Sequence, residues 1–243
     1  MPPQDDYSES GLLLVDKPQE WTSHDVVNCV RRRFAISKVG HCGTLDPIAT
    51  GLLVLLLGRA TRLSSRLLSQ DKVYSGVLCL GIETHSQDRT GDVTATADPG
   101  GVTPQAIQAA AARLLGPIMQ VPPMVSALKR DGQRLYKLAR RGEEVEREPR
   151  PVHIHRLDIE AIEMPMVRFT VHCSKGTYIR TLCADMGRDL GCGAHMYDLR
   201  RLRSGPFRIE DAHTIDAIKQ WDRATLLTHM TPLAAVVVGL MDA

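Results

Sequence analysis

The chain has 243 residues, enough for one large domain or for one domain with an appendage. Hydrophobic residues make up 43% and charged residues 24% of the chain, which is the composition of a globular protein. The formal net charge of +2 excludes a strongly basic or acidic chain, so any nucleic-acid site must be a local cluster of positive charge.

The termini and apolar segments argue against a membrane or secreted protein. The first eleven residues are polar and acidic, unlike a signal peptide, and the longest apolar run, residues 51–57, is far too short to span a bilayer. Six cysteines include no Cys-x-x-Cys pair, which argues against a zinc site and favours reduced, buried thiols. We therefore expect a cytoplasmic protein.

The chain begins with a strand and a capped helix. Residues 12–15 form a short apolar strand that ends at the Lys-Pro pair of residues 17–18. Thr22 or Ser23 is expected to cap a helix whose apolar residues recur on one face. Three arginines, residues 31–33, end that helix, where cations suit the macrodipole. They are either a solvated helix end or an RNA contact.

The remaining predicted elements alternate irregularly between strands and helices. In chain order they are a loop over 40–51, a buried strand over 52–57, a helix over 59–68, a strand over 73–80, a helix from Thr103 to Gly116, paired strands over 152–162 and 166–173, a helix over 178–190, a strand over 196–202, and a helical tail. No strand-helix-strand rhythm is present. This pattern predicts an α+β fold with a mixed, largely antiparallel sheet and flanking helices.

A basic insertion, residues 122–151, interrupts this pattern. Between residues 129 and 150 it holds eight cations against five acids, and few of its residues could pack in a core. We expect a thin helix with an exposed basic face. The segment is either a solvated insertion or an arm that folds against a polyanion, whose phosphates supply the missing counter-charge.

Residues 40–51 carry the densest cluster of chemically interesting side chains. Three glycines in twelve residues allow unusual backbone angles and the close approach of a ligand, and Asp46 before Pro47 is pushed toward an extended conformation. Alone, an Asp-Pro pair is more often a turn or a helix cap than a nucleophile. No Walker-type Gly-Lys-Ser/Thr follows, so spacing by itself does not assign the loop.

The loop sequence K-V-G-H-C-G-T-L-D-P-I-A-T-G-L-L closely resembles the catalytic motif of TruB-type tRNA pseudouridine synthases. Other segments resemble that family's motifs in the same order; they are residues 15–27, 72–74, 122–140, 174–180 and 199–202. Glu20 departs from the family pattern, which often has glycine at this point. This departure leaves the conformation of the loop around Glu20 open.

The resemblance implies a site-specific isomerase that acts on the T-loop uridine, position 55 of tRNA. The reaction breaks the bond between ribose C1′ and uracil N1, turns the base, and reattaches it through C5. Asp46 is implied as the nucleophile or base, as glycosidases use a carboxylate against an anomeric carbon. Attack on the sugar, attack on the base and deprotonation at C2′ all remain open.

Further roles follow from the same resemblance. Arg180 is implied to pair with the catalytic carboxylate, because an opposite charge favours its ionised form. Tyr74 is implied to stack on the flipped base, which offsets the cost of leaving the helical stack. His41 matches the histidine that enters the gap left by that base. The other implied substrate contacts are Leu199, Lys17, Lys175, Arg130, Arg134 and Lys137, of which Lys17 is expected to support the site structurally.

No metal or organic cofactor is implied, because the isomerisation needs neither a redox change nor a group donor. We expect a flexible N-terminus over 1–10, a catalytic domain over 11–212 with a mobile RNA-binding insertion over 122–151, and a helical tail over 213–243. Bacterial relatives usually continue into a PUA-like RNA-binding domain. Too few residues remain here for that module, so a weaker grip on the acceptor stem is expected.

The expected partner is the T-arm of tRNA, bound by a monomer that needs neither a membrane nor an obligate protein partner. Three alternatives stay open. The chain could be a guide-RNA-dependent synthase that acts on ribosomal RNA, although that group usually has a complete PUA domain. It could be a non-catalytic chaperone that opens the tRNA elbow, or a structural α+β domain, which would leave the basic arm and the loop over 40–51 unexplained.

Overall fold

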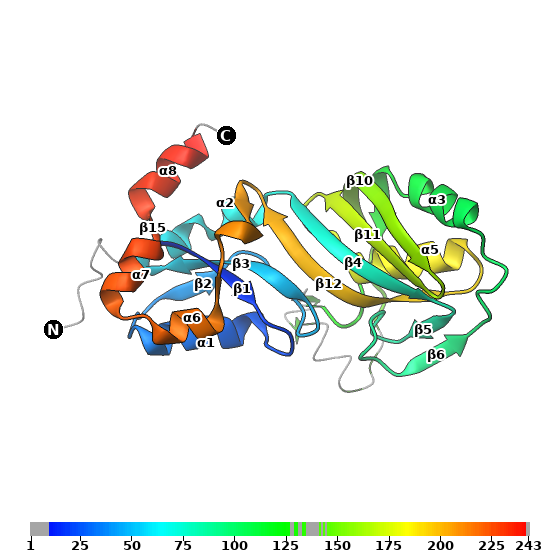
Figure 1. Ribbon diagram of the computed structural model, residues 1–243, viewed down its shortest axis with the longest axis horizontal. Helices are drawn as coiled ribbons and strands as arrows, with labels where there is room; N and C mark the ends of the chain where they lie inside the picture. Colours follow the sequence, from blue (N-terminus) through cyan, green and yellow to red (C-terminus); the bar gives the residue numbers. More distant parts are fainter. Residues whose placement is uncertain are drawn as a thin grey trace. The chain divides into compact units, whose positions relative to one another are not determined.

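The computed structural model describes residues 10–126, 129–130, 133–134, 141, 143 and 145–241. The chain folds into two compact units. The first contains the residues up to Val73 and those from Arg200 onward, and the second spans Tyr74–Leu199. Two strands, β4 (Lys72–Leu80) and β12 (Ala194–Ser204), contribute residues to both units. The fold is α+β, as the sequence predicts, with a mixed sheet and flanking helices (Figure 1).

The sheet of the first unit has the strand order β14-β1-β3-β12. Its strands are β1 (Gly11–Lys17), β2 (Val39–His41), β3 (Thr50–Leu57), β13 (Phe207–Arg208), β14 (His213–Thr214) and β15 (Thr231–Pro232). β1 and β3 pair antiparallel along their whole length, from Gly11 opposite Leu57 to Lys17 opposite Gly51. β12 joins β3 in parallel, with Arg201 opposite Gly51.

Both faces of this sheet are covered. The unbroken run of apolar residues in β3 is buried along its length, as expected for a strand that packs on two sides. On one face Leu12, Leu52 and Val54 form a core with Val236 of α8 (Leu233–Met241). Since side chains alternate along a strand, the buried Leu13, Val15, Leu53 and Leu55 face the other side.

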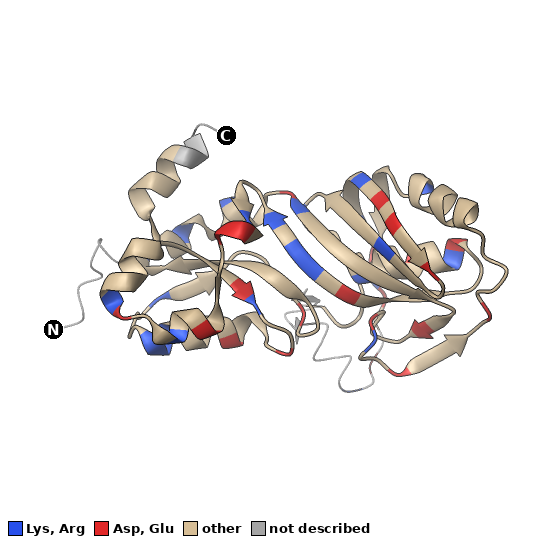
Figure 2. Cartoon of the chain, viewed as in Figure 1, with Lys and Arg blue, Asp and Glu red and all other residues tan. Residues whose placement is uncertain are grey.

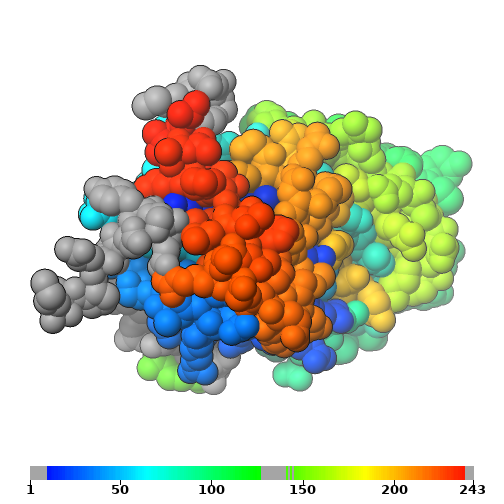
Figure 3. Space-filling model, turned by 60° about the vertical axis from the view of Figure 1, so that its left-hand side comes forward, coloured from blue at the N-terminus to red at the C-terminus, as the bar shows by residue number. Residues whose placement is uncertain are grey.

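Helix α1 (Ser23–Arg33) is capped by Thr22, one of the two residues predicted for this role. The Thr22 hydroxyl accepts a hydrogen bond from the Asp25 backbone N–H, and Asp25 accepts one in return, which forms a capping box. Helix α6 (Ile215–Gln220) lies beside α1 (Figures 1 and 3), and Arg223 at the start of α7 (Arg223–His229) donates to the carbonyl of Phe34 after α1 at 3.1 Å. The exposed arginines at the end of α1 (Figure 2) include Arg33, which donates to the Lys219 carbonyl at 2.9 Å.

The second unit has the strand order β12-β4-β11-β10-β7. Its other elements are β5 (Ile82–Thr84), β6 (Val93–Thr96), α3 (Pro104–Arg113), β7 (Gly116–Gln120), β8 (Lys129–Arg130), β9 (Gln133–Arg134), β10 (Arg150–Glu163), β11 (Met166–Cys173) and α5 (Ile179–Asp189). β10 and β11 are paired antiparallel, as predicted. Phe169 and Val171 of β11 are buried together with residues of α3 and α5, so one face of this sheet carries the core.

Three expectations about local structure need correction. The helix expected over 59–68 is divided into a 3₁₀ helix η2 (Gly58–Leu63) and a short helix α2 (Ser64–Leu68). β2 and the start of β3 shorten the loop expected over 40–51 to residues 42–49. The thin helix expected in the basic insertion begins instead as a pair of strands, with Lys129 opposite Arg134. The sequence between these two strands is Asp-Gly, which is common in hairpin turns. The prediction of a helix considered the charges of the segment and did not use this turn signal.

Part of that insertion, including Lys137, lies outside the described residues. All six cysteines are free, and five of them are buried, as predicted. None of the described helices combines the length and the apolar character needed to cross a membrane.

Candidate active site

The loop that carries Asp46 joins β2 to β3 in the first unit and is fixed by polar contacts to the segment before α1. The buried hydroxyl of Ser23 accepts a hydrogen bond from the Leu45 N–H at 2.8 Å and donates to the Leu45 carbonyl at 3.1 Å. The Glu20 N–H donates to the Pro47 carbonyl at 2.8 Å. Backbone groups on both sides of Asp46 are therefore held by residues more than twenty positions earlier.

Glu20 reaches Pro47 because its backbone adopts φ +67°, in the left-handed region that favours glycine. The sequence difference from the family at this position thus preserves the backbone conformation that glycine would adopt easily. A left-handed conformation costs a side-chain-bearing residue on the order of 1 kcal/mol. The neighbouring contacts of the loop must offset that cost.

Lys17 lies beneath the same loop with none of its side chain exposed. Its ammonium donates to the carbonyls of Pro18 at 2.9 Å, Trp21 at 2.6 Å and Pro47 at 3.4 Å. Burial lowers the pKa of Lys17 to about 8, while the nearby charge of Asp46 acts in the opposite direction. Lys17 therefore ties the segment that follows it to the Asp46 loop and presents positive charge toward Asp46. The supporting role expected for it stays a prediction.

Arg201 is a second buried cation under the loop, with 1% of its surface exposed. Its guanidinium donates to the Leu52 carbonyl at 2.7 Å and to the Gly43 carbonyl at 3.1 Å, so it binds both ends of the loop. Its backbone also approaches closely: a Cβ added at Gly51, whose φ is +97°, would lie 2.4 Å from the Arg201 carbonyl oxygen. Only glycine fits there.

Asp46 itself is half-buried between two buried neighbours, Leu45 and Ile48. Its carbonyl accepts from the Ala49 N–H at 3.0 Å, which forms a tight turn after Pro47. The apolar neighbours anchor the loop in the core while the Asp46 carboxyl group remains partly accessible. A carboxylate on a rigid loop, close to a buried ammonium, is suited to nucleophilic or base chemistry.

His41 ends β2 and is also half-buried. Burial is the main cause that lowers its pKa, and the positive charge of Arg201 adds to it, so the ring is neutral near pH 7. Among the described residues, its buried Nδ1 has no hydrogen-bond partner. Lys17, His41 and Asp46 are thus brought together around the loop of the first unit.

Tyr74 lies on β4 in the second unit and is 9% exposed. Strand alternation places Tyr74, Gly76 and Leu78 on one face. A Cβ at Gly76 would lie 2.6 Å from the Phe169 ring, so the glycine makes room for that ring beside Tyr74. Tyr74 is therefore a largely buried residue of this strand face.

Arg180 lies in the first turn of α5 and is 3% exposed. It donates to the carbonyls of Ser86 at 3.0 Å and Val125 at 2.8 Å, and its Nε lies 3.9 Å from the Asp88 carboxylate. Asp88 is in turn held by Thr90, whose hydroxyl donates to it at 2.6 Å. A fixed carboxylate thus partly balances the charge of Arg180 within the second unit.

The turn before Arg180 is clamped by a buried side chain. Gln120, at the end of β7, donates to the Tyr178 carbonyl at 3.1 Å and accepts from the Tyr178 N–H at 2.8 Å. These two hydrogen bonds fix the residue at which α5 begins. Lys175 is exposed on the same turn, where a cation can reach a phosphate.

The other predicted contacts are placed less specifically. Leu199 is 6% exposed at the end of the second unit's part of β12, and its contact with the substrate stays a prediction. Arg130 and Arg134 lie on the β8–β9 pair, and Lys137 is outside the described residues. Since Asp46 belongs to the first unit and Arg180 to the second, the expected pairing of the two stays a prediction.

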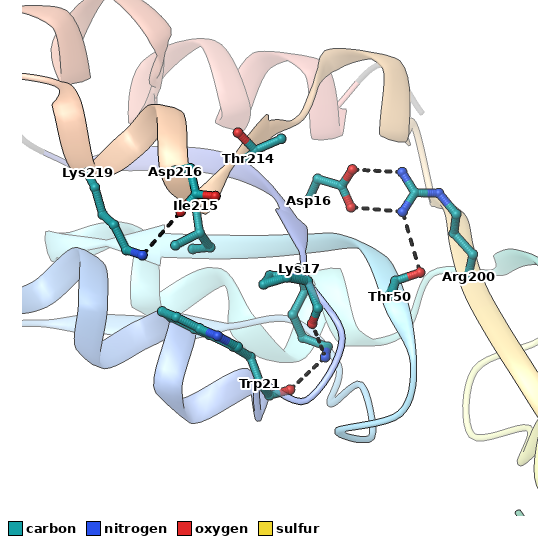
Figure 4. A pocket seen from close by; sticks show the side chains of 10 residues that line it. Asp16, Lys17, Trp21, Thr50, Arg200, Thr214, Ile215, Asp216 and Lys219 are labelled. Carbon is teal, nitrogen blue, oxygen red and sulfur yellow. Dashed lines mark hydrogen bonds and ion pairs between the residues drawn. The ribbon is translucent and has the colours of Figure 1, made fainter. Parts of the chain in front are cut away.

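A pocket of about 350 Å³ opens in the first unit, with Lys17 and Trp21 in its lining (Figure 4). Arg200 crosses it to form a bidentate ion pair with Asp16, at 3.0 and 2.7 Å, and Lys219 pairs with Asp216 at 3.2 Å beside Trp21. Asp46 is not among the residues that line this pocket. The Asp16–Arg200 pair ties β1 to the start of the first unit's part of β12.

Three residues of this arrangement were not identified from the sequence. Arg201 stood inside a recognised motif, but nothing marked it as buried. Asp88 and Gln120 carried no signal at all, because their roles depend on partners far along the chain: 92 positions separate Asp88 from Arg180, and 58 separate Gln120 from Tyr178.

Comparison with known proteins places this geometry in a family. Residues 31–179 match the model described as TruB family pseudouridylate synthase (N terminal domain), and residues 180–238 match the tRNA pseudouridylate synthase B C-terminal domain. The tRNA pseudouridine synthase B of Syntrophotalea carbinolica is 53% identical over 86% of this chain and 69% of its own length. That of Geobacter sulfurreducens is 46% identical over 96% of this chain and 75% of its own length.

Among solved structures, a chain of a Cbf5-Nop10-Gar1 complex is similar with a TM-score of 0.73 and 31% identity. The match covers 95% of the present chain and 62% of that one, so this chain spans about three-fifths of its length. Together with the loop around Asp46, these matches identify the chain as a member of the TruB family of pseudouridylate synthases.

Proposed function

We propose that the chain isomerises uridine to pseudouridine in tRNA, at position 55 of the T-loop, with Asp46 as the reacting carboxylate. The observation that carries this proposal is the anchoring of the Asp46 loop. Ser23, Lys17 and Arg201 hold its backbone while the Asp46 carboxyl group stays partly accessible. The relatives named tRNA pseudouridine synthase B support tRNA as the substrate.

In the proposed reaction the C1′–N1 bond of the uridine breaks, the uracil turns, and a C1′–C5 bond forms. The proton on C5 then leaves to solvent and the nitrogen released from C1′ takes up a proton, so that no atom is gained or lost overall. Asp46 supplies the nucleophile or base that starts this sequence. Tyr74 stacks on the everted base, and Arg180 supplies positive charge to the reacting carboxylate. Asp88 positions Arg180 for this role.

The RNA is gripped through its phosphates and its splayed loop bases rather than through a groove, which is how proteins usually read RNA loops. The basic insertion over 122–151 would fold against the T-arm, with Arg130, Arg134 and Lys137 on phosphates. Replacing these three by glutamine should weaken binding and make its salt dependence shallower. An unchanged salt slope would argue against phosphate contacts.

The test is release of tritium from a T-arm hairpin labelled at uridine C5. The wild type should release label, and Asp46→Asn should bind the hairpin without releasing it. The chain offers a matched control in Asp98→Asn, because Asp98 also precedes a proline but is exposed. Within the part of the chain that the structure describes, its side chain accepts a single local hydrogen bond, from the Gly100 N–H at 2.9 Å. This variant should release label like the wild type.

The same assay separates the alternatives. If both wild type and Asp46→Asn bind but neither releases label, the protein is an RNA-folding chaperone and the catalytic proposal fails. If release occurs only after guide RNA and partner proteins are added, the guide-RNA-dependent activity is supported. The higher identity to the tRNA enzymes than to the Cbf5 chain favours release by the protein alone.

A further inference from the structure

Helix α1 ends in three consecutive arginines on the surface of the first unit (Figure 2). Arg31, Arg32 and Arg33 are all exposed. Helix α7 brings a further exposed arginine to the same place, because Arg223 donates to the carbonyl of Phe34, the residue after Arg33, at 3.1 Å. We call Arg31, Arg32, Arg33 and Arg223 the α1 basic cluster.

The macrodipole of α1 does not account for this much charge. The C-terminus of a helix carries the equivalent of only about half an elementary negative charge, whereas α1 ends in three full positive charges. Neighbouring cations on a surface also repel one another. A single cation would therefore serve the helix better than three.

Two helices of the second unit end differently. Arg113 in the last turn of α3 pairs with Asp189 at 2.5 Å, and Arg188 in the last turn of α5 pairs with Asp185 at 2.8 Å. In contrast, no ion pair joins the three arginines of α1 to a carboxylate within the described part of the chain. The terminal cations of α3 and α5 are neutralised, and those of α1 are not.

The hydrogen bonds of these arginines go to uncharged oxygens. Arg31 donates to the amide oxygen of Asn28 at 2.8 Å, and Arg33 donates to the carbonyl of Lys219 at 2.9 Å. Such contacts hold the guanidinium groups in place but leave their charge uncompensated.

An acid that the charge of Arg33 reaches, Asp222, is already bound elsewhere. Asp222 caps α7, where its Oδ1 accepts from the Thr225 N–H at 2.8 Å and from the Thr225 hydroxyl at 2.6 Å. These hydrogen bonds lower the pKa of Asp222, and the charge of Arg33 acts in the same direction. With one such carboxylate beside four guanidinium groups, the cluster keeps a net positive charge.

The cluster lies at the opposite end of α1 from the Asp46 loop. Ser23 in the first turn of α1 holds Leu45 of that loop, and the 11 residues of α1 rise by about 1.5 Å each, or roughly 16 Å in total. This length is about two Debye lengths at physiological salt. The cluster therefore acts by direct contact with a ligand and not through its field at Asp46.

We propose that the α1 basic cluster binds phosphates of the tRNA outside the T-loop, an inference that rests on the proposed function for the identity of the RNA. A nucleic-acid duplex presents phosphates every few ångströms along its axis. Arginine binds phosphate through two parallel hydrogen bonds. The phosphates supply the counter-charge that these helix ends lack. Of the two interpretations that the sequence leaves open for residues 31–33, the uncompensated charge favours the RNA contact.

The experiment measures the affinity of the full chain for a full-length tRNA transcript by fluorescence anisotropy, from about 50 to 200 mM salt. The Arg31→Gln, Arg32→Gln double variant should bind more weakly. Its slope of log affinity against log salt should be shallower by about two, because each lost phosphate contact removes about one. Arg31 and Arg32 are chosen because Arg33 and Arg223 also hold backbone carbonyls. The Arg31→Lys, Arg32→Lys variant keeps both charges and should restore most of the slope.

The matched control is the Arg113→Gln, Arg188→Gln double variant. It also removes two arginines from helix ends, but from positions where carboxylates already neutralise them. This control should keep the salt slope of the wild type. The proposal is overturned if the Arg31→Gln, Arg32→Gln variant keeps that slope, or if both double variants lower it equally, because net charge alone would then govern binding.

Tritium release separates this inference from the proposed function. If the wild type releases label and the Arg31→Gln, Arg32→Gln variant keeps the wild-type salt slope, only the role of the cluster is refuted. If that variant has the shallower slope but the wild type releases no label, only the catalytic proposal is refuted. A wild type that binds no tRNA overturns both.

Discussion

The two units hold their buried cations in different ways. In the first unit the hydrogen bonds of Lys17 and Arg201 go to backbone carbonyls, five in all. In the second unit Arg180 also binds two carbonyls, but a fixed carboxylate, that of Asp88, lies 3.9 Å from its Nε. In the first unit the carbonyls satisfy the N–H donors of Lys17 and Arg201 but do not neutralise their positive charge. In the second unit the Asp88 carboxylate also supplies a negative charge to Arg180.

This difference separates two functions of a buried cation. Because Lys17 and Arg201 bind carbonyls, each of them cross-links distant segments of the chain. The positive charge of Lys17 acts on Asp46, and that of Arg201 acts on His41. The Asp88 carboxylate instead orients Arg180 and reduces the cost of burying it. Substitutions in the first unit should therefore affect stability strongly, while removal of the counter-charge in the second should affect mainly catalysis.

The largest effect is expected for Arg201→Met. The change leaves the Leu52 and Gly43 carbonyls without their donor in the interior, at about 1–3 kcal/mol for each unsatisfied group. We expect the free energy of unfolding to fall by about 3 kcal/mol in urea titrations. Arg201→Lys, which keeps the charge and one donor group, should lose less. Equal midpoints for wild type and Arg201→Met would show that the cross-link is unimportant.

Lys17→Met should reveal the pH dependence that burial creates. The pKa of Lys17 is about 8 in the folded chain and lies near its ordinary value of about 10.4 in the unfolded chain. Between these values the unfolded chain binds more protons, so the contribution of Lys17 to stability rises as the pH increases from 8 to 10. The wild type should gain about 1–2 kcal/mol relative to Lys17→Met over this range.

The measurement is urea unfolding of both proteins at pH 8, 9 and 10. Groups that titrate equally in the two chains cancel in the difference between their unfolding free energies. A stability difference that stays constant with pH would mean that Lys17 titrates normally. Lys17→Arg is an informative third variant, because it keeps a charge that does not titrate in this range but cannot match the three carbonyls as an ammonium does.

Asp88→Asn removes the counter-charge of Arg180 but keeps an oxygen to accept from Thr90. The fold should be nearly unchanged, while Arg180 loses the group that orients it. We expect tritium release to slow by about tenfold, which corresponds to about 1.4 kcal/mol. Asp92→Asn is the control, because Asp92 is fully exposed in the same unit. If Asp88→Asn and Asp92→Asn are equally active, Asp88 does not position Arg180.

The fold could be predicted where a single segment carries its own signal. The apolar run of β3, the Thr22 cap of α1 and the Thr103 cap of α3 were all found in the sequence and are confirmed. β7 was not predicted, since it contains Pro117 and buries only Gln120 completely. The parallel pairing of β12 with β3 could not be predicted either, because it joins segments 150 residues apart.

The same distinction applies to the candidate site. The loop around Asp46 was found from its glycines and its resemblance to the family, both of which are local in sequence. The contact of Arg201 with Gly43 spans 158 positions and that of Arg180 with Ser86 spans 94. Arginine is usually exposed, so its burial becomes visible only when the distant carbonyls are placed in space.

The smallest effect is expected when the N-cap residue of one helix in each unit is replaced. Thr22 caps α1 and Thr103 caps α3, and each hydroxyl accepts a backbone bond at 3.1 Å. Replacing either by alanine should cost about 1 kcal/mol of unfolding free energy. Only α1 carries Ser23, whose hydroxyl holds Leu45 beside Asp46. Thr22→Ala should therefore also slow tritium release, by less than about tenfold, whereas Thr103→Ala should leave it unchanged. Equal release by the two variants would show that fraying of α1 does not reach the Asp46 loop.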